Sequence, residues 1–141
     1  MSKKTLNPLT KTLKVTDRQL SIIRNALELY DRLLIGQIET QLWNLYIFNR
    51  DLNHEEFSDA CTRLKQIVFP ELHRNESYAV GWKEGNVQQN NSQIAYEIEA
   101  MIRHLEWKLK EDAPRYVTSA NPPLHYSTES FIEMEVITPD E

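Results

Sequence analysis

The stretch from Thr16 to Phe48 contains no proline and one glycine, Gly36, and it constrains the fold more than any other feature of the sequence. Thr16 and Gln19 have the spacing of a capping box, which marks the first turn of a helix. We therefore predict one long helix from about residue 17 to residue 48, kinked near Gly36. Its main stripe recurs at spacings of three and four: Ile23, Leu27, Tyr30, Leu34, Ile38, Gln41 and Leu45.

A second apolar stripe, formed by Ile22, Leu29 and Leu33, lies on a different side of the same predicted helix. A helix that is apolar on two sides is buried on two sides. The long helix is therefore expected to be either the central helix of the fold or a contact between subunits.

Two further helices are indicated by start and stop signals. Asn53 and Glu56 repeat the capping pattern, and that helix must end before Pro70. A polar connection over residues 70–91 leads to a third helix, which we expect to begin near residue 91 or 92 and to end by residue 112. The expected inward residues are Phe57, Cys61, Leu64 and Val68 in one helix and Ile94, Ile98, Met101, Leu105 and Leu109 in the other.

Apolar and acidic residues alternate near the C-terminus, where Ile132, Met134 and Val136 are separated by glutamates. This alternation is typical of a half-buried edge strand, and the short alternation over residues 12–15 is its natural partner. The predicted fold is mainly α: a three-helix core with a long central helix and a small two-stranded β-ribbon formed by the N- and C-terminal segments. We expect a single domain over residues 1–141, with a flexible basic N-terminus (1–11), a core with terminal strands (12–137) and an acidic tail (138–141).

The composition argues against several classes of function. The net charge of −5 disfavours binding to duplex nucleic acid, which requires a basic face. No apolar run is long enough to span a membrane. Cys61 is the only cysteine and the four histidines are scattered, so we expect no metal and no cofactor. A cytoplasmic protein is the expectation that remains.

The charges are spread unevenly along the chain. Residues 1–18 carry a net charge of +4, and residues 128–141 carry −5. The two ends would attract each other if the fold brought them together, although two solvated tails would show the same pattern.

No arrangement of residues points to catalysis. Cys61 and His104 lack a third orienting group, and the pair Glu55 and Glu56 is explained by the favourable field at a helix N-terminus. Glu97 and Glu99 would point to opposite sides of a helix, so they do not form an acid–base pair. We therefore expect that the protein is not an enzyme.

The strongest candidate for binding is the face of the third helix that carries Tyr96, Arg103 and Trp107, with His104 beside it. An arginine between aromatic residues can stack on a planar ligand and pair with a phosphate. The alternative is structural: the aromatic rings pack under a loop or in a subunit contact, and Arg103 pairs with a carboxylate such as Asp31 or Glu39.

Further hydroxyl, amide and guanidinium groups could join that face. They are Tyr30, Arg32 and Gln37 from the long helix, and Ser77 and Tyr78 from the polar connection. Such a set suits recognition of a polar, anionic molecule and does not suit bond breaking.

Three segments resemble one family of small proteins encoded in tailed-bacteriophage genomes. Residues 26–37 (ALELYDRLLIGQ) are similar to an ALDLYSRIGIGQ-like stretch, residues 75–80 (NESYAV) to an NGSYGI-like loop, and residues 94–104 (IAYEIEAMIRH) to an AYDIxQVIRH-like helix. Two departures are notable: Asp31 replaces a small hydroxyl residue, and Ala79 replaces a glycine of the loop.

The resemblance implies a phage accessory protein that acts in the cytoplasm of a bacterial host. Our leading hypothesis is a non-enzymatic protein that sequesters a small polar or nucleotide-derived ligand and so counters a host defence. Arg32 and Arg103 would hold the anionic group, and Tyr78 and Tyr96, or Trp107, would stack on a base. The alternative is a homo-oligomer whose surface inhibits or redirects a host protein.

Overall fold

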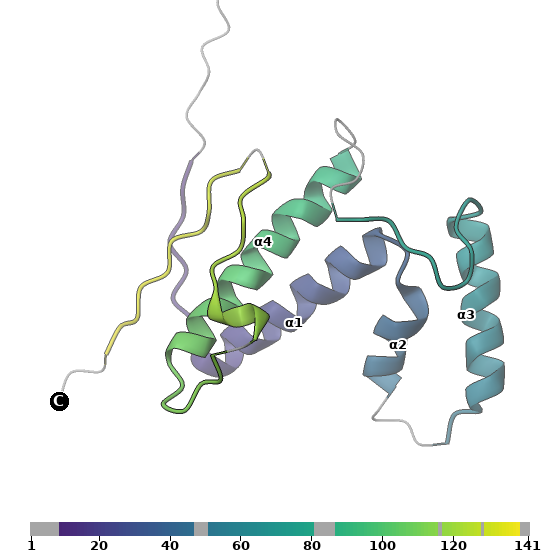
Figure 1. Ribbon diagram of the computed structural model, residues 1–141, viewed down its shortest axis with the longest axis horizontal. Coiled ribbons are helices and arrows are strands. Elements are labelled where there is room, and N and C mark those ends of the chain that lie inside the picture. Colours follow the sequence, from purple (N-terminus) through teal and green to yellow (C-terminus); the bar gives the residue numbers. More distant parts are fainter. Residues whose placement is uncertain (1–8, 47–50, 81–86, 116, 128, 139–141) are drawn as a thin grey trace, which may run out of the picture.

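The computed structural model describes residues 9–46, 51–80, 87–115, 117–127 and 129–138. Within these residues the secondary structure is entirely helical (Figure 1). The elements are α1 (Asp17–Leu34), α2 (Ile38–Tyr46), α3 (His54–Val68), α4 (Val87–Lys108) and the short 3₁₀ helix η1 (Thr118–Ala120). The mainly α fold class is thereby confirmed.

Two of the expected helix starts are confirmed in atomic detail. The Thr16 hydroxyl accepts a hydrogen bond from the backbone N–H of Gln19 at 3.2 Å, and the Gln19 side chain accepts one from the backbone N–H of Thr16 at 2.9 Å. At the start of α3 the Asn53 side chain accepts from the backbone N–H of Glu56 at 3.0 Å. These contacts satisfy N–H groups that the first helical turn leaves without partners.

The prediction of one long central helix is wrong, because the chain breaks at Gly36 into α1 and α2. Gly36 has a φ of +93°, in the left-handed region that favours glycine. The N–H groups of Gly36 and Gln37 donate to the carbonyls of Leu33 and Arg32, which is the Schellman pattern of a helix end. A Cβ at position 36 would also lie 2.7 Å from Leu72 Cδ1, so a larger residue would fit there only if Leu72 moved.

The principal packing is between α1 and α4, which run antiparallel (Figure 1). Arg24, in the first half of α1, contacts Glu106 near the end of α4 at 2.8 Å. The opposite side of α4 is covered by η1 and the segment that follows it. The buried apolar side chains of the described residues are few: Ile35, Ile38, Cys61, Ala95, Ala100 and Ile102.

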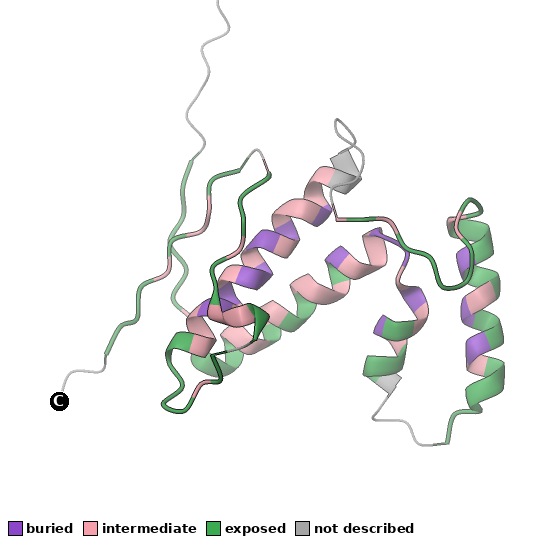
Figure 2. Cartoon of the chain, viewed as in Figure 1, coloured by how far each residue is buried: buried purple, intermediate pink, exposed green. Residues whose placement is uncertain are grey.

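The second packing unit is the pair α2 and α3, which lies at the other end of the molecule (Figure 1). Cys61 is buried there, as expected. Several residues that were expected to face inward are instead exposed: Tyr30, Leu45, Leu64, Val68 and Leu109. Figure 2 shows the wide exposed surface of α3, which α2 covers on one side only.

The predicted β-ribbon is absent from residues 9–16 and 129–138, which run as extended chain without strand pairing. Ile132 and Met134 are half-buried, as expected, but Leu13 and Val136 are exposed, and the two segments do not pair as strands. Residues 1–8 and 139–141, which include most of the expected basic end and the acidic tail, lie outside the described residues.

The third helix begins earlier than predicted, at Val87, and ends at Lys108. The polar connection before it therefore occupies fewer residues than the predicted 70–91. None of the helices in the described ranges is both long and apolar enough to cross a bilayer.

Candidate functional site

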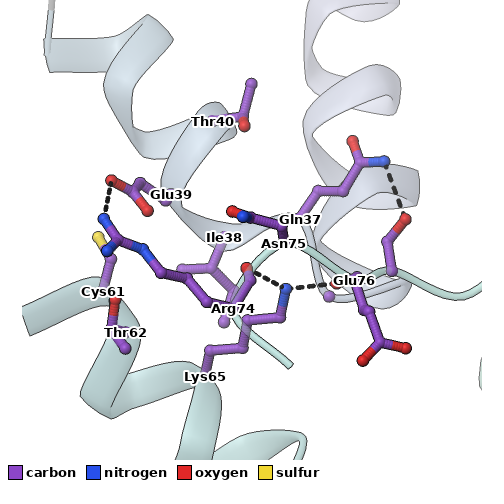
Figure 3. Close-up of a pocket in the computed structure, with 12 residues that line it drawn as sticks. Gln37, Ile38, Glu39, Thr40, Cys61, Thr62, Lys65, Arg74, Asn75 and Glu76 are labelled. Carbon is purple, nitrogen blue, oxygen red and sulfur yellow. Dashed lines mark hydrogen bonds and ion pairs between the residues drawn. The ribbon is translucent and has the colours of Figure 1, made fainter. Parts of the chain in front are cut away.

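A pocket of about 290 Å³ lies where the α1–α2 turn, the start of α2, the middle of α3 and the segment 74–77 meet (Figure 3). Its walls are mostly polar. The lining residues are Gly36, Gln37, Ile38, Glu39, Thr40, Cys61, Thr62, Lys65, Arg74, Asn75, Glu76 and Ser77.

Backbone contacts around Gly36 bring two of the predicted site residues into this pocket. The N–H of Tyr78 donates to the carbonyl of Ile35 at 2.9 Å, which fixes the loop against the α1–α2 turn. Gln37 and Ser77 then face each other, and Gln37 Nε2 donates to Ser77 Oγ at 3.3 Å (Figure 3). An amide and a hydroxyl therefore stand side by side at the edge of the pocket.

Lys65 fixes the far wall of the pocket. Its side chain is buried, and Nζ donates to the backbone carbonyls of Arg74 (2.9 Å) and Glu76 (Figure 3). A buried ammonium group is costly unless it is hydrogen-bonded, so these two bonds anchor the loop to α3.

Arg74 belongs to a small polar network at the pocket mouth. Its Nη2 donates to Ser58 Oγ at 2.5 Å, and Ser58 Oγ donates to Glu39 Oε1 at 2.7 Å. The guanidinium also lies 3.9 Å from that carboxylate (Figure 3). Because the Arg74 side chain is more than half exposed, part of its donor set faces solvent.

Cys61 lines the same pocket but is poorly suited to act as a nucleophile. Burial and the negative charge of Glu39 both raise the pKa of its thiol. A raised pKa keeps the sulfur protonated, and the protonated thiol is the unreactive form.

Tyr78 lies next to the pocket without lining it. Its hydroxyl donates to Glu71, and its ring meets Phe69 edge-on with centroids 6.2 Å apart. Tyr30 and Arg32 are on α1, where Tyr30 is exposed and Arg32 Nε lies 3.8 Å from an Asp31 oxygen.

The predicted site residues on α4 make contacts of a different kind. The His104 ring contacts the backbone carbonyl of Ser119 at 2.9 Å and stacks on Trp107, whose Nε1 donates to the carbonyl of Pro114 at 2.7 Å. These contacts brace the segment that follows α4. Tyr96 is half-buried on the same helix.

Arg103 pairs with a carboxylate on its own helix rather than with Asp31 or Glu39. Its Nε lies 2.6 Å from Glu99 Oε1, and its Nη2 donates to Oε2 at 3.0 Å. Glu99 is buried, and its pKa is raised by that burial although Arg103 lowers it. The positive charge of the Arg103 guanidinium thus offsets part of the cost of burying the Glu99 carboxylate.

The least expected feature is Asp31, whose side chain is fully buried between α1 and α4. Within the described residues neither of its oxygens has a hydrogen-bond partner. Burial raises its pKa from 3.8 to about 7, with Arg32 opposing that shift and Glu99 adding to it. Its helical spacing from Leu27 and Ile35 was the signal in the sequence that it would face inward.

Taken together, the structure brings Gln37, Ser77 and Tyr78 to one place and sets Arg103, His104 and Trp107 along α4. Lys65, Arg74 and Glu39 complete the pocket, and sequence reasoning did not find them. In the described ranges no three side chains of histidine, cysteine, aspartate or glutamate are grouped so that they could hold a metal ion. Comparison with known proteins found no matching family model, curated protein or solved structure.

Proposed function

We propose that this protein binds a small polar molecule with an anionic group, without chemical conversion, in the pocket beside Gly36. The observation that carries the proposal is the convergence of Gln37 from the α1–α2 turn with Ser77 and Arg74 from the segment 74–77 on one hollow. Amide, hydroxyl and guanidinium groups together can fix the orientation of a polar ligand and pair with its charge.

The size of the pocket limits the ligand. Binding pockets for small molecules span about 300–1,000 Å³, and this one has about 290 Å³. A single nucleotide unit or a smaller fragment of a nucleotide-derived signal is the class that we propose. Together with the phage-like segments of the sequence, this suggests an accessory protein that removes such a molecule from the host cytoplasm.

Substitutions at Arg74 and Glu39 should change the affinity for an anion in opposite directions, which makes the proposal testable. Its carboxylate competes with any bound anion for Arg74, because it already lies 3.9 Å from that guanidinium. Arg74→Ala should weaken anion binding at least tenfold, since a charge-assisted pair contributes about 1.5–3 kcal/mol. Glu39→Gln should strengthen binding, because it removes a like charge.

The measurement is isothermal titration calorimetry with AMP and with inorganic phosphate as probes. Arg18→Ala, an exposed arginine on α1 away from the pocket, is the matched control and should bind as the wild type does. If the Arg74→Ala and Glu39→Gln variants both bind with the wild-type affinity, this pocket is not the binding site.

A second candidate function is that of a homo-oligomeric module that engages a host protein. It is favoured by the exposed apolar side chains on α2 and α3, which include Leu45, Leu64, Ile67 and Val68. Native mass spectrometry of the purified chain tests this candidate directly, and a monomer would contradict it.

A further inference from the structure

Glu39 is an unexpected neighbour for an arginine that binds an anion. Its carboxylate lines the same pocket as Arg74, and Glu39 Oε1 lies 3.9 Å from Arg74 Nη2 (Figure 3). An anion that pairs with this guanidinium therefore lies close to a second negative charge. Such repulsion lowers the affinity for a bare anion, and binding proteins use unpaired charge of this kind to reject the wrong ligand.

Ser58 holds the two charged groups in a fixed arrangement. Its Oγ accepts a hydrogen bond from Arg74 Nη2 at 2.5 Å and donates one to Glu39 Oε1 at 2.7 Å, and the Ser58 side chain is buried. The 3.9 Å between guanidinium and carboxylate is too long for a direct hydrogen bond. Glu39 is thus oriented by a neutral hydroxyl, and its charge stays available to a ligand.

Both charged groups retain hydrogen-bonding capacity. A guanidinium has five N–H donors, and within the described residues the Arg74 side chain donates one of them, to Ser58. A carboxylate has two acceptor oxygens, and in the described chain the hydrogen bond and the ion pair of Glu39 both engage Oε1. Oε2 can therefore accept a hydrogen bond from a ligand whose anionic group is bound by Arg74.

The short distance between the two groups restricts the ligand. A charge-assisted hydrogen bond from arginine spans about 2.8 Å, and Glu39 Oε1 lies 3.9 Å from the same Arg74 nitrogen. A donor that sits between the anionic group and Glu39 therefore lies within roughly 4 Å of the anionic oxygen. Groups on adjacent carbon atoms have this separation.

The remaining polar groups of the pocket are neutral. Gln37 and Asn75 contribute amides and Ser77 contributes a hydroxyl, and such groups recognise the uncharged polar parts of a ligand. Among nucleotides, a ribonucleoside 3′- or 2′-phosphate has a free hydroxyl on the carbon next to its phosphate. A 5′-phosphate has none on the adjacent carbon.

We propose that Glu39 selects anionic ligands that carry a hydrogen-bond donor on the carbon next to the anionic group, as a ribonucleoside 3′-phosphate does. This inference rests on the proposed function, ligand binding in the pocket beside Gly36, and assigns its specificity. Arg74 holds the phosphate, and Glu39 accepts a hydrogen bond from the neighbouring 2′-hydroxyl. A phosphate without that hydroxyl meets the Glu39 charge uncompensated.

The first test compares two probes that differ in one hydroxyl, 3′-AMP and 2′-deoxyadenosine 3′-monophosphate, by isothermal titration calorimetry. At about pH 8 a phosphate monoester, with a second pKa of about 6, is a dianion without an O–H of its own. The wild type should bind 3′-AMP at least tenfold more tightly, because a hydrogen bond to a carboxylate is charge-assisted. 5′-AMP should share the weaker affinity of the deoxy probe.

The second test uses variants of the pocket. Glu39→Gln keeps an acceptor for Ser58 and removes the charge, so the preference for 3′-AMP should fall to about threefold or less. Arg74→Ala should weaken both probes by a similar factor and preserve the preference. Glu111→Gln, at an exposed position beyond α4, is the control and should keep both wild-type affinities, and circular dichroism should show unchanged helix content in all three variants.

The results separate failure of this inference from failure of the proposed function. If the wild type binds both 3′-phosphates equally and Arg74→Ala weakens both, the pocket stands and selection by Glu39 is overturned. If the preference persists in Glu39→Gln, another residue recognises the hydroxyl and the assignment to Glu39 is wrong. If no probe binds the wild type, the proposed function and this inference are both overturned.

A further probe distinguishes a nucleotide from a smaller phosphorylated alcohol. Glycerol 3-phosphate has the same phosphate and neighbouring hydroxyl but no base. It should bind more weakly than 3′-AMP and should also lose affinity in Glu39→Gln. If it binds as tightly as 3′-AMP, recognition of the hydroxyl is supported and the nucleotide class is overturned.

Discussion

Asp31 is the residue whose environment differs most from what its chemistry prefers. It is fully buried without a hydrogen bond in the described chain, and its pKa is raised to about 7 by that burial. Arg32 and Arg103 lower that pKa, whereas Glu28 and Glu99 raise it further. The carboxyl group therefore keeps its proton to a much higher pH than an ordinary aspartate does.

The stability of the protein should consequently fall as the pH rises from about 4 to about 7. Between the ordinary pKa of 3.8 and the folded value of about 7, the folded state holds a proton that the unfolded state has released. The free energy of unfolding therefore decreases over this range, by up to about 4 kcal/mol at 1.4 kcal/mol per pKa unit. The raised pKa of Glu99 acts in the same direction.

Asp31→Asn should remove most of this pH dependence, because an amide stays neutral. We expect its free energy of unfolding at pH 8 to exceed that of the wild type by about 1–4 kcal/mol, with a smaller difference at pH 6. Urea unfolding followed by circular dichroism at several pH values measures it. Asp112→Asn, at an exposed position, should change nothing, and parallel pH profiles for Asp31→Asn and the wild type would contradict the assignment.

Single residues differ in how far the sequence predicted them. Cys61 was correctly placed in the core, because its position in an apolar stripe and its small size agree. Asp31 was not, since a carboxylate in a stripe is usually exposed. Arg103 was expected to reach a ligand or a carboxylate elsewhere, and its partner is Glu99, one turn away on the same helix. Which of several nearby charges forms a pair depends on packing that sequence spacing does not specify.

At the scale of elements, Glu97 acts as a clamp between α4 and the segment that follows η1. Its carboxylate accepts hydrogen bonds from the backbone N–H groups of Tyr126 at 2.6 Å and Ser127 at 2.9 Å. Burial would raise its pKa, but the hydrogen bonds from Ser127, Tyr126 and Gln93 outweigh burial and hold the pKa below its ordinary value.

Glu97→Gln should loosen this segment while leaving α4 intact. We expect amide hydrogen exchange at Tyr126 and Ser127 to accelerate at least fivefold, because the loss of a charge-assisted bond costs about 1–3 kcal/mol. In the wild type the clamp should weaken as the pH falls through the lowered pKa of Glu97, which is the opposite sign to Asp31. Glu133→Gln, an exposed glutamate, serves as the control. Unchanged exchange at both amides would mean that other contacts hold the segment.

Helix beginnings were more predictable than the break between helices. Thr16 and Asn53 form local caps whose partners lie three residues away, so the sequence alone contains the whole motif. The break at Gly36 depends also on Leu72, which lies against the glycine from a distant segment. The local sequence around Gly36 is compatible with either a kinked helix or two separate helices. Only the tertiary contact with Leu72 distinguishes the two.

At the scale of the whole molecule, α1 and α4 form the principal packing of the fold. α2 contacts α1 and α3 to a similar, smaller extent. The sequence predicted that the protein is helical but not this pairing, because pairing depends on contacts between residues that are far apart in the chain. The candidate pocket was missed in part for the same reason, since Arg74 and Lys65 meet Gln37 only through the docking of the loop on Gly36.

If the chain associates with itself, as the second candidate function proposes, it should be more stable at higher concentration. If folding and association are coupled, the midpoint of thermal unfolding rises with protein concentration by mass action. We expect an increase of several degrees between about 2 and 200 µM for the wild type. Differential scanning fluorimetry at matched buffer conditions measures it. A midpoint independent of concentration would indicate that each copy folds alone.

The order of the helices has a further consequence during synthesis. α2 and α3 are inserted between α1 and α4, so α1 leaves the ribosome well before its packing partner is made. The local pair α2 and α3 can form as it emerges, whereas the α1–α4 core must wait until α4 and the Glu97 clamp have been translated. The nascent chain, with the inner face of α1 uncovered, is therefore the form of this protein that depends most on chaperones.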